Sequence, residues 1–272
     1  MKLSLLTLLL AFISLPAYSQ EEYQNFGQAY AFEPRQQVYV FDTATIRLSP
    51  DPRAELMIRV APGRSLFVVQ TGKMLTINNK SAPWVQVTYH SGGPVLKGFV
   101  WSGQLSPRAL NVDDVQFVYG MRFGKDPGDE SVVTVRALRN DSLIATVSFK
   151  AGHESSRGVH EASVMPSKGM EDLKKILHFY YSGEACGIPV YDQYIGWDGS
   201  RLTLFPVLLS ASEAGISYVE EKYIFPADKG GKSGQIIKRT ETAEYDENDK
   251  ITNKKVATTR YRWHPAKGLI KL

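Results

Sequence analysis

Short apolar runs divided by turn residues dominate the chain between Val38 and Leu105. The runs are rich in β-branched and aromatic residues, and each is bounded by glycine, proline, asparagine or serine. No ten-residue helical pattern fits anywhere in this stretch. Frequent short strands with such turns are typical of a small antiparallel barrel. We therefore predict a small β-domain over residues 38–106.

A second β-rich region follows a break at residues 106–111. Three apolar, β-branched runs open it, at residues 115–123, 132–138 and 143–149. The last two are divided by Arg-Asn-Asp-Ser, which is a strong hairpin signal. Further on, residues 235–245 and 251–263 flank a charged turn and carry polar residues at nearly every position, which predicts a long two-stranded ribbon with at least one face in water. The pattern predicts a larger antiparallel β-rich domain over residues 111–272.

The segment at residues 152–181, which follows these three runs, leaves one alternative open. Residues 152–168 are polar and contain glycine, which predicts a loop. Met170, Leu173, Leu177 and Tyr180 then recur at helical spacing, which predicts a short helix near residues 169–178. The run from Ile176 to Tyr181 fits a strand equally well. The fold class is mainly β in either case.

The N-terminal residues have the pattern of an export signal. Lys2 supplies a positive charge, residues 3–15 are apolar, and Ala17-Tyr18-Ser19 offers small residues for cleavage. We expect residues 1–19 to be a signal peptide and the protein to be periplasmic or secreted, with no membrane span after cleavage. Residues 20–37 are a polar leader that we expect to become ordered against the first domain.

Composition narrows the function classes further. The chain has 272 residues, of which 43% are hydrophobic and 22% are charged, and this is normal for two folded domains. Loss of Lys2 leaves an excess of three basic side chains, which is too small to indicate a nucleic-acid partner. Cys186 is the only cysteine, so no intramolecular disulfide can form.

The order of motifs between Ala44 and Leu105 resembles the bacterial SH3-like (SH3b) domain. That family opens with N-x-R-x-x-P, continues with a turn glycine before a hydrophobic strand, and closes with W-x-x-V and G-[YW]-V. The corresponding residues here are Ala-Thr-Ile-Arg-Leu-Ser-Pro at 44–50, Pro62-Gly63, Trp84 to Val87, and Gly98-Phe99-Val100. The resemblance implies an SH3-like barrel, and Leu48 and the long segment 71–83 depart from it. The C-terminal region is similar to uncharacterised exported SH3-domain proteins, which implies no activity.

Aromatic side chains in this domain are candidates for a binding surface. By analogy with the family, Trp84 and Phe99 are structural, whereas Tyr39, Tyr89 and Trp101 are the candidates for an exposed platform that binds a peptide.

Catalytic constellations are weak. Cell-wall peptidases that accompany SH3-like domains use a Cys-His pair, in which the cysteine directly follows an aspartate and the histidine lies in a Gly-His strand further on. Here Cys186 follows alanine, and only His264 comes after it. The pairs His153-Glu154 and His160-Glu161 lack the spacing of a zinc helix. Residues 246–249 lack the spacing and glycine of a calcium loop. We predict no metal and no cofactor.

These observations favour an exported, non-catalytic binding protein whose SH3-like domain docks a peptide. The peptide would be a peptidoglycan stem or a segment of an envelope protein. The alternatives are a cell-wall hydrolase with its site at Cys186 or in the loop from His153 to Glu161, and an inhibitor of a secreted enzyme. The sequence does not indicate an oligomeric state.

Overall fold

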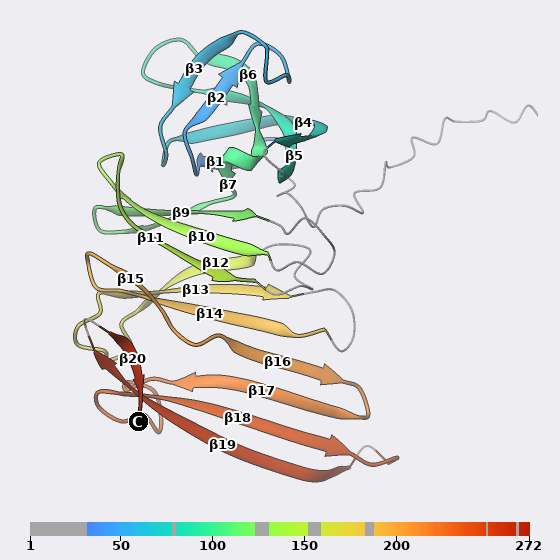
Figure 1. Ribbon diagram of the computed structural model, residues 1–272, viewed down its shortest axis with the longest axis vertical. Coiled ribbons are helices and arrows are strands. Elements are labelled where there is room, and N and C mark those ends of the chain that lie inside the picture. Colours follow the sequence, from blue (N-terminus) through green and yellow to red (C-terminus); the bar gives the residue numbers. More distant parts are fainter. Residues whose placement is uncertain are drawn as a thin grey trace, which may run out of the picture.

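Antiparallel β-sheets make up the computed structural model (Figure 1). The structure describes residues 32–77, 80–122, 131–151, 159–182, 188–248, 250–264 and 267–272. Within these residues the one short helical element is a 3-10 turn, η2, at Ser102–Gln104. The prediction of a mainly β, antiparallel protein is confirmed. None of the described residues forms a helix that is both long and apolar enough to cross a membrane.

The first sheet contains seven strands in the order β3-β2-β6-β5-β4-β1-β7. Their bounds are β1 Gln37–Val40, β2 Ala44–Arg47, β3 Leu56–Val60, β4 Ser65–Ile77, β5 Lys80–Tyr89, β6 Leu96–Trp101 and β7 Leu105–Ser106. Alternate side chains such as Val38, Val40 and Leu66 are buried in one core. No sheet among the described residues closes on itself, so a closed SH3-like barrel is not confirmed and stays a prediction.

The end of the predicted leader belongs to this first core. Phe32 is only 3% exposed, and its carbonyl accepts a hydrogen bond of 3.0 Å from the Thr71 hydroxyl. The rest of the leader and the predicted signal peptide, residues 1–31, lie outside the described residues.

A four-stranded meander follows, in the order β11-β10-β9-β8. Its strands are β8 Ala109–Val112, β9 Val115–Arg122, β10 Val132–Arg139 and β11 Ser142–Lys150. The turn between the last two strands places Asn140 and Asp141 at φ values of 49° and 63°. Two consecutive left-handed residues of this kind favour a tight hairpin, so the predicted hairpin is confirmed.

The largest sheet contains nine strands, in the order β12-β13-β14-β16-β17-β18-β19-β20, with β15 paired beside β14. The bounds are β12 Val159–Pro166, β13 Lys175–Ser182, β14 Val190–Trp197, β15 Leu202–Leu204, β16 Leu208–Glu213, β17 Ser217–Ile224, β18 Gln235–Tyr245, β19 Ile251–His264 and β20 Gly268–Lys271. The predicted ribbon is β18 and β19, which project beyond the rest of the sheet in Figure 1.

The four-stranded sheet packs against strands β12–β15 through a shared aromatic core. Phe117 meets Trp197 edge to face at 5.2 Å between ring centroids, and Tyr119 meets Phe179 at the same distance. Such geometry is favourable beyond the area buried. A second core around Phe205, Tyr223 and Trp263 holds the far end of the large sheet.

Strands β16–β19 carry polar side chains on both faces. Lys238 and Glu221 form an ion pair of 2.6 Å, and Lys254 and Glu241 form another of 2.6 Å. The strand register pairs Glu241 with Glu220, which neighbours Glu221, so the two ion pairs lie on opposite faces. Every β19 residue from Ile251 to Thr258 is exposed, so the expected water-facing ribbon is confirmed.

Two local predictions are wrong. Residues 167–174 form turns, and Lys175–Ser182 is strand β13, so the strand alternative holds and the short helix near 169–178 is absent. Leu177 and Phe179 point into the aromatic core as alternate strand residues, and this tertiary burial outweighs the helical spacing. The predicted loop at 152–168 is also wrong in part, since Val159–Pro166 is β12.

Candidate functional site

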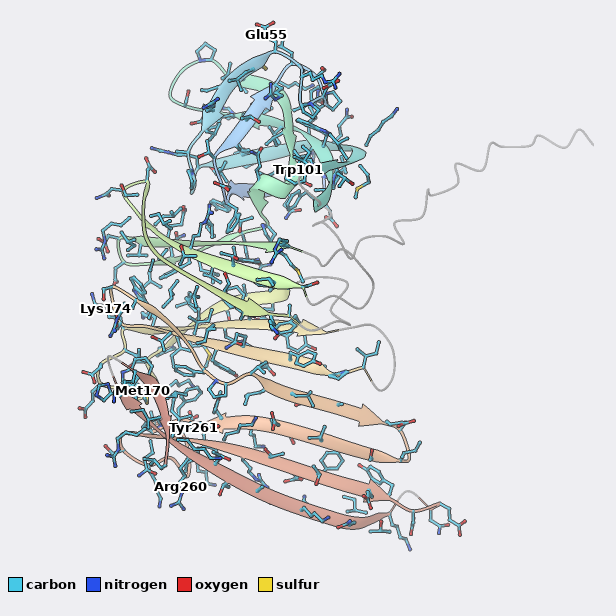
Figure 2. The ribbon with its side chains drawn as sticks, viewed as in Figure 1. Glu55, Trp101, Met170, Lys174, Arg260 and Tyr261 are labelled. Atoms are coloured by element: carbon cyan, nitrogen blue, oxygen red, sulfur yellow. The ribbon has the colours of Figure 1, made fainter. Side chains whose placement is uncertain are left out.

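A groove with a volume of about 430 Å³ opens beside the two tryptophans of the first sheet. Its walls come from β2, β4, β5, β6, η2, the turn after β1, the loop between β2 and β3, and the last residue of β9, Arg122. It therefore lies where the first sheet meets the four-stranded sheet. Figure 2 shows Trp101 on the side of the first sheet that faces the four-stranded sheet.

Trp101 is held rigidly at the base of this groove. Its indole N–H donates to the carbonyls of Leu75 at 3.1 Å and Ala82 at 3.0 Å, which fixes the ring between β4 and β5. Gly103 in η2 lies over the ring, and a Cβ there would come within 2.2 Å of Trp101 Cζ3. Only glycine therefore allows the 3-10 turn to pass so close to the indole.

Trp84 lies opposite Trp101 in the strand register and also lines the groove. The residue is 2% exposed, and its Nε1–H has no hydrogen-bond partner among the described residues. A buried donor without a partner costs about 1–3 kcal/mol. Such groups are rare in folded proteins, which makes this donor a notable feature of the groove residue Trp84.

Guanidinium groups give the groove a basic wall. Arg47, which donates to the Ala54 carbonyl at 2.5 Å, contributes from β2, and exposed Arg122 contributes from the end of β9. Asp42 is the one acidic residue of the lining. Its carboxylate lies 3.3 Å from Arg136 Nη1, so part of its charge is already compensated within the protein.

Arg136 also connects the two parts of the chain that form the groove. It lies on β10, donates to the Phe41 carbonyl at 2.9 Å, and its Cζ stands 4.4 Å from the centre of the Phe41 ring. Gly120 on β9 is in close contact with the same ring, because a Cβ there would lie 2.7 Å from Phe41 Cδ1. The turn after β1 is thereby fixed against the four-stranded sheet.

Gln104 closes the groove next to this turn. Its side-chain oxygen accepts from the Thr45 amide at 3.3 Å, and its side-chain nitrogen donates to the Thr43 carbonyl at 2.9 Å. The groove is thus largely preformed, which lowers the entropic cost of ligand binding.

The three predicted platform residues do not form one surface. Trp101 lines the groove, but it is only 8% exposed and is not the exposed ring that we expected, because its indole is hydrogen-bonded between strands. Tyr89 pairs with Leu96 at the other end of β5, five residues or roughly 17 Å from Trp84. It lines a separate hollow with Arg59 and Arg64.

Tyr39 lines neither of these pockets. It is half-buried on β1, where its register partners are Ser65 and Ser106. Trp84, which the sequence suggested to be structural, is indeed buried, but it also contributes to the groove.

Candidates for catalysis fall largely outside the described residues. These include Cys186, within residues 183–187, and His153-Glu154, within residues 152–158. Glu161 lies exposed on β12, and His264 is the exposed last residue of β19. In the described part of the chain, no three His, Cys, Asp or Glu side chains cluster closely enough to hold a metal ion.

Comparisons with known proteins add no assignment. No family model, no curated protein and no solved structure matches this chain. The groove therefore has to be interpreted from its own chemistry.

Sequence reasoning missed most of the groove. Arg122 belongs to the second region of the chain, and Gln104 and Asp42 looked like ordinary turn residues. The one sequence signal for the groove was the Trp-Ser-Gly-Gln stretch at 101–104, in which a glycine stands two residues after a tryptophan.

Proposed function

We propose that this protein is an exported, non-catalytic binding protein, and that its SH3-like domain docks an extended peptide in the groove between Trp84, Trp101 and Arg122. The peptide is either a peptidoglycan stem or a segment of an envelope protein. The observation that carries the proposal is that Trp84, which lines a preformed groove, has a buried N–H with no acceptor among the described residues.

An extended peptide suits the donors and acceptors of the groove. A peptide carbonyl accepts the Trp84 hydrogen bond, and a carboxylate of the peptide pairs with Arg47 and Arg122, because guanidinium groups bind carboxylates well. The Trp101 and Ile77 side chains supply apolar area for the adjoining side chain. A few fixed polar groups on an apolar lining are typical of ligand sites.

Peptidoglycan stems fit the basic wall because they carry free carboxylates. The weak overall charge of the chain supports a local interaction of this kind over a broad electrostatic one. Export is supported by the N-terminal pattern of Lys2 and the apolar run that follows it.

The test is retention of the full mature chain on purified cell-wall sacculi and on immobilised stem peptide. The variants are Arg122→Gln and Trp84→Phe in the groove, with Tyr89→Ala in the separate hollow as the matched control. We expect both groove variants to lose about tenfold in affinity, and Tyr89→Ala to bind as the wild type does. Loss of binding in Tyr89→Ala alone would move the site away from the groove. Absence of binding by the wild type to either material would reject the proposed ligand.

A further inference from the structure

Strand β19 forms an open edge of the large sheet. It pairs with β18 from Ile251 to Arg262, but on its other side β20 pairs only with Tyr261–His264. Figure 1 shows β19 as the outermost strand of this sheet. Every residue from Ile251 to Thr258 is exposed. Among the described residues, no strand pairs with the outer side of residues 251–259.

One hydrogen bond identifies the backbone groups that face outward from this edge. The Arg260 carbonyl accepts from the Leu272 amide at 2.9 Å, on the side away from β18. In an antiparallel strand the amide and carbonyl of every second residue point to the same side. The register with β18 is regular over residues 253–262, so the alternation continues along the edge. The outward-facing amides and carbonyls are therefore those of Lys254, Val256 and Thr258.

The charges of the edge are partly balanced within the chain. An open edge is a template for another strand, and lysines on it usually discourage such pairing. Here the Lys254 ammonium lies 2.6 Å from the Glu241 carboxylate. On the opposite face of the sheet, Lys255 and Glu244 line the same hollow, so a carboxylate shares that face with the second ammonium. The two lysines therefore oppose pairing less than their number suggests.

A second copy of this chain fits the edge, because β19 is complementary to itself in one register. Two antiparallel copies related by a twofold axis can meet with the axis at any residue from 254 to 258. With the axis at Val256, Lys254 lies opposite Thr258 of the second copy, and Lys255 lies opposite Ala257. The two Val256 side chains then lie opposite each other, and each is 51% exposed in the single chain.

Every other position of the axis brings like charges together, which is destabilising. With the axis at Lys254 or at Lys255, that lysine meets its own copy. With the axis at residue 257 or 258, Lys254 lies opposite Arg260 or Arg262 of the second copy. Only the register centred on Val256 places both lysines opposite uncharged residues.

We propose that β19 pairs with β19 of a second copy, antiparallel and centred on Val256, and so joins the two large sheets across a twofold axis. The ladder spans residues 253–259, because the Leu272 amide already occupies the carbonyl of Arg260 beyond it. The outward-facing pairs, Val256 with Val256 and Lys254 with Thr258, each exchange two backbone hydrogen bonds. This interface shares no residue with the peptide groove and does not depend on the proposed function.

Sedimentation equilibrium of the full mature chain over a range of concentrations provides the test, and we expect a monomer–dimer equilibrium. Val256→Pro removes an outward-facing amide without removing a bond to β18, and Val256→Lys places two ammonium groups opposite each other. We expect each variant to weaken dimerisation about tenfold. Ile216→Lys is the matched control and should dimerise as the wild type does, because Ile216 is 55% exposed in the turn between β16 and β17, away from the edge. Melting temperatures separate loss of the dimer from loss of the fold, and Val256→Lys keeps every backbone bond.

Thr258→Glu tests the register, because it places a carboxylate opposite Lys254 of the second copy. We expect dimerisation to become about threefold tighter, whereas Ile216→Glu, with the same charge change, should leave it unchanged. A dimer that Thr258→Glu does not tighten would overturn the register centred on Val256. A dimer that neither Val256 variant weakens would place the contact on another surface and overturn the proposal. A wild-type chain that stays monomeric at every concentration would overturn it as well, and would leave the edge to a partner of different sequence.

Discussion

Trp84 and Trp101 lie directly opposite each other on β5 and β6, but among the described residues only the Trp101 indole N–H has a hydrogen-bond acceptor. Trp101 donates to two backbone carbonyls, whereas Trp84 donates to none among the described residues. The two rings therefore have different roles in the same core. Trp101 holds β4 and β5 together, and Trp84 supplies a donor for a ligand in the proposed function.

Substitution of the two tryptophans by phenylalanine should separate these roles. Trp101→Phe leaves the Leu75 and Ala82 carbonyls without this donor, so we expect it to lower the free energy of unfolding by about 1–3 kcal/mol. Trp84→Phe breaks no hydrogen bond within the described structure and should cost less. Urea unfolding of both variants gives the comparison. A larger loss in Trp84→Phe than in Trp101→Phe would contradict the assignment.

Gly103→Ala should distort the groove where the 3-10 turn η2 crosses the Trp101 ring. The added Cβ would lie 2.2 Å from the Trp101 ring, so the ring or the 3-10 turn must move, and we expect an overpacking cost of about 1–3 kcal/mol. Gly93→Ala is the matched control, because that position has no heavy atom within 4 Å of the added Cβ. Thermal unfolding reports the overpacking cost, and the tryptophan fluorescence spectrum, compared between the two variants, reports a change around Trp101. Identical behaviour of the two variants would mean that the turn adjusts freely.

Arg136→Met should loosen the contact between the first sheet and the four-stranded sheet. The substitution keeps much of the side-chain volume but removes the Phe41 carbonyl bond, the Asp42 ion pair and the stacking on the Phe41 ring. We expect weaker binding in the groove and a loss of about 1–2 kcal/mol of stability. Arg59→Met, at an exposed position of β3, controls for the lost charge. Unchanged peptide affinity in Arg136→Met would show that the turn after β1 is fixed without this residue.

Acid should destabilise the large sheet through Glu241. The Lys254 ammonium and the Tyr218 hydroxyl, each 2.6 Å from its carboxylate, lower the pKa of Glu241 from 4.5 to about 2. Because the folded pKa is lower than the unfolded one, the stabilisation is complete above about pH 4.5 and is lost as the pH falls toward 2. We expect Glu241→Gln to flatten the dependence of the melting temperature on pH in this range.

Glu213→Gln serves as the control for that experiment, because it neutralises an exposed carboxylate on the same sheet. If it flattened the pH dependence as much as Glu241→Gln does, the stabilisation would come from general charge and not from the Lys254 and Tyr218 contacts. Raised salt should weaken the effect little, because the Glu241 side chain is only 13% exposed.

Local pattern was sufficient for most strands and turns. Turn residues such as Asn140 and Asp141 adopt left-handed backbone conformations in the hairpin that they predict, and the alternation of apolar residues in β1 matches its buried face. These features depend on a few neighbouring residues, which the sequence displays directly. The ribbon of β18 and β19 was predictable for the same reason, since strands with polar residues at nearly every position require no partner sheet.

Helical spacing misled where burial decided the outcome. Leu173 and Leu177 stand four residues apart, but they belong to different cores, on a turn and on β13 respectively. Spacing cannot distinguish one helical face from two separate packing environments. That choice was made by the aromatic residues of the four-stranded sheet, which lie far away in the sequence.

The sequence by itself determined that this chain is antiparallel β, that a new sheet begins at the break at residues 106–111, and that Trp84 is buried. Only the tertiary structure brought Arg122 into the groove that Trp101 lines and Arg136 onto Phe41. Only it left the N–H groups of Trp84 and Trp263 without partners among the described residues. The physical reason is the distance along the chain over which each kind of interaction acts. Strand and turn preferences act between near neighbours, whereas a ligand groove is made by side chains whose meeting depends on how whole sheets pack.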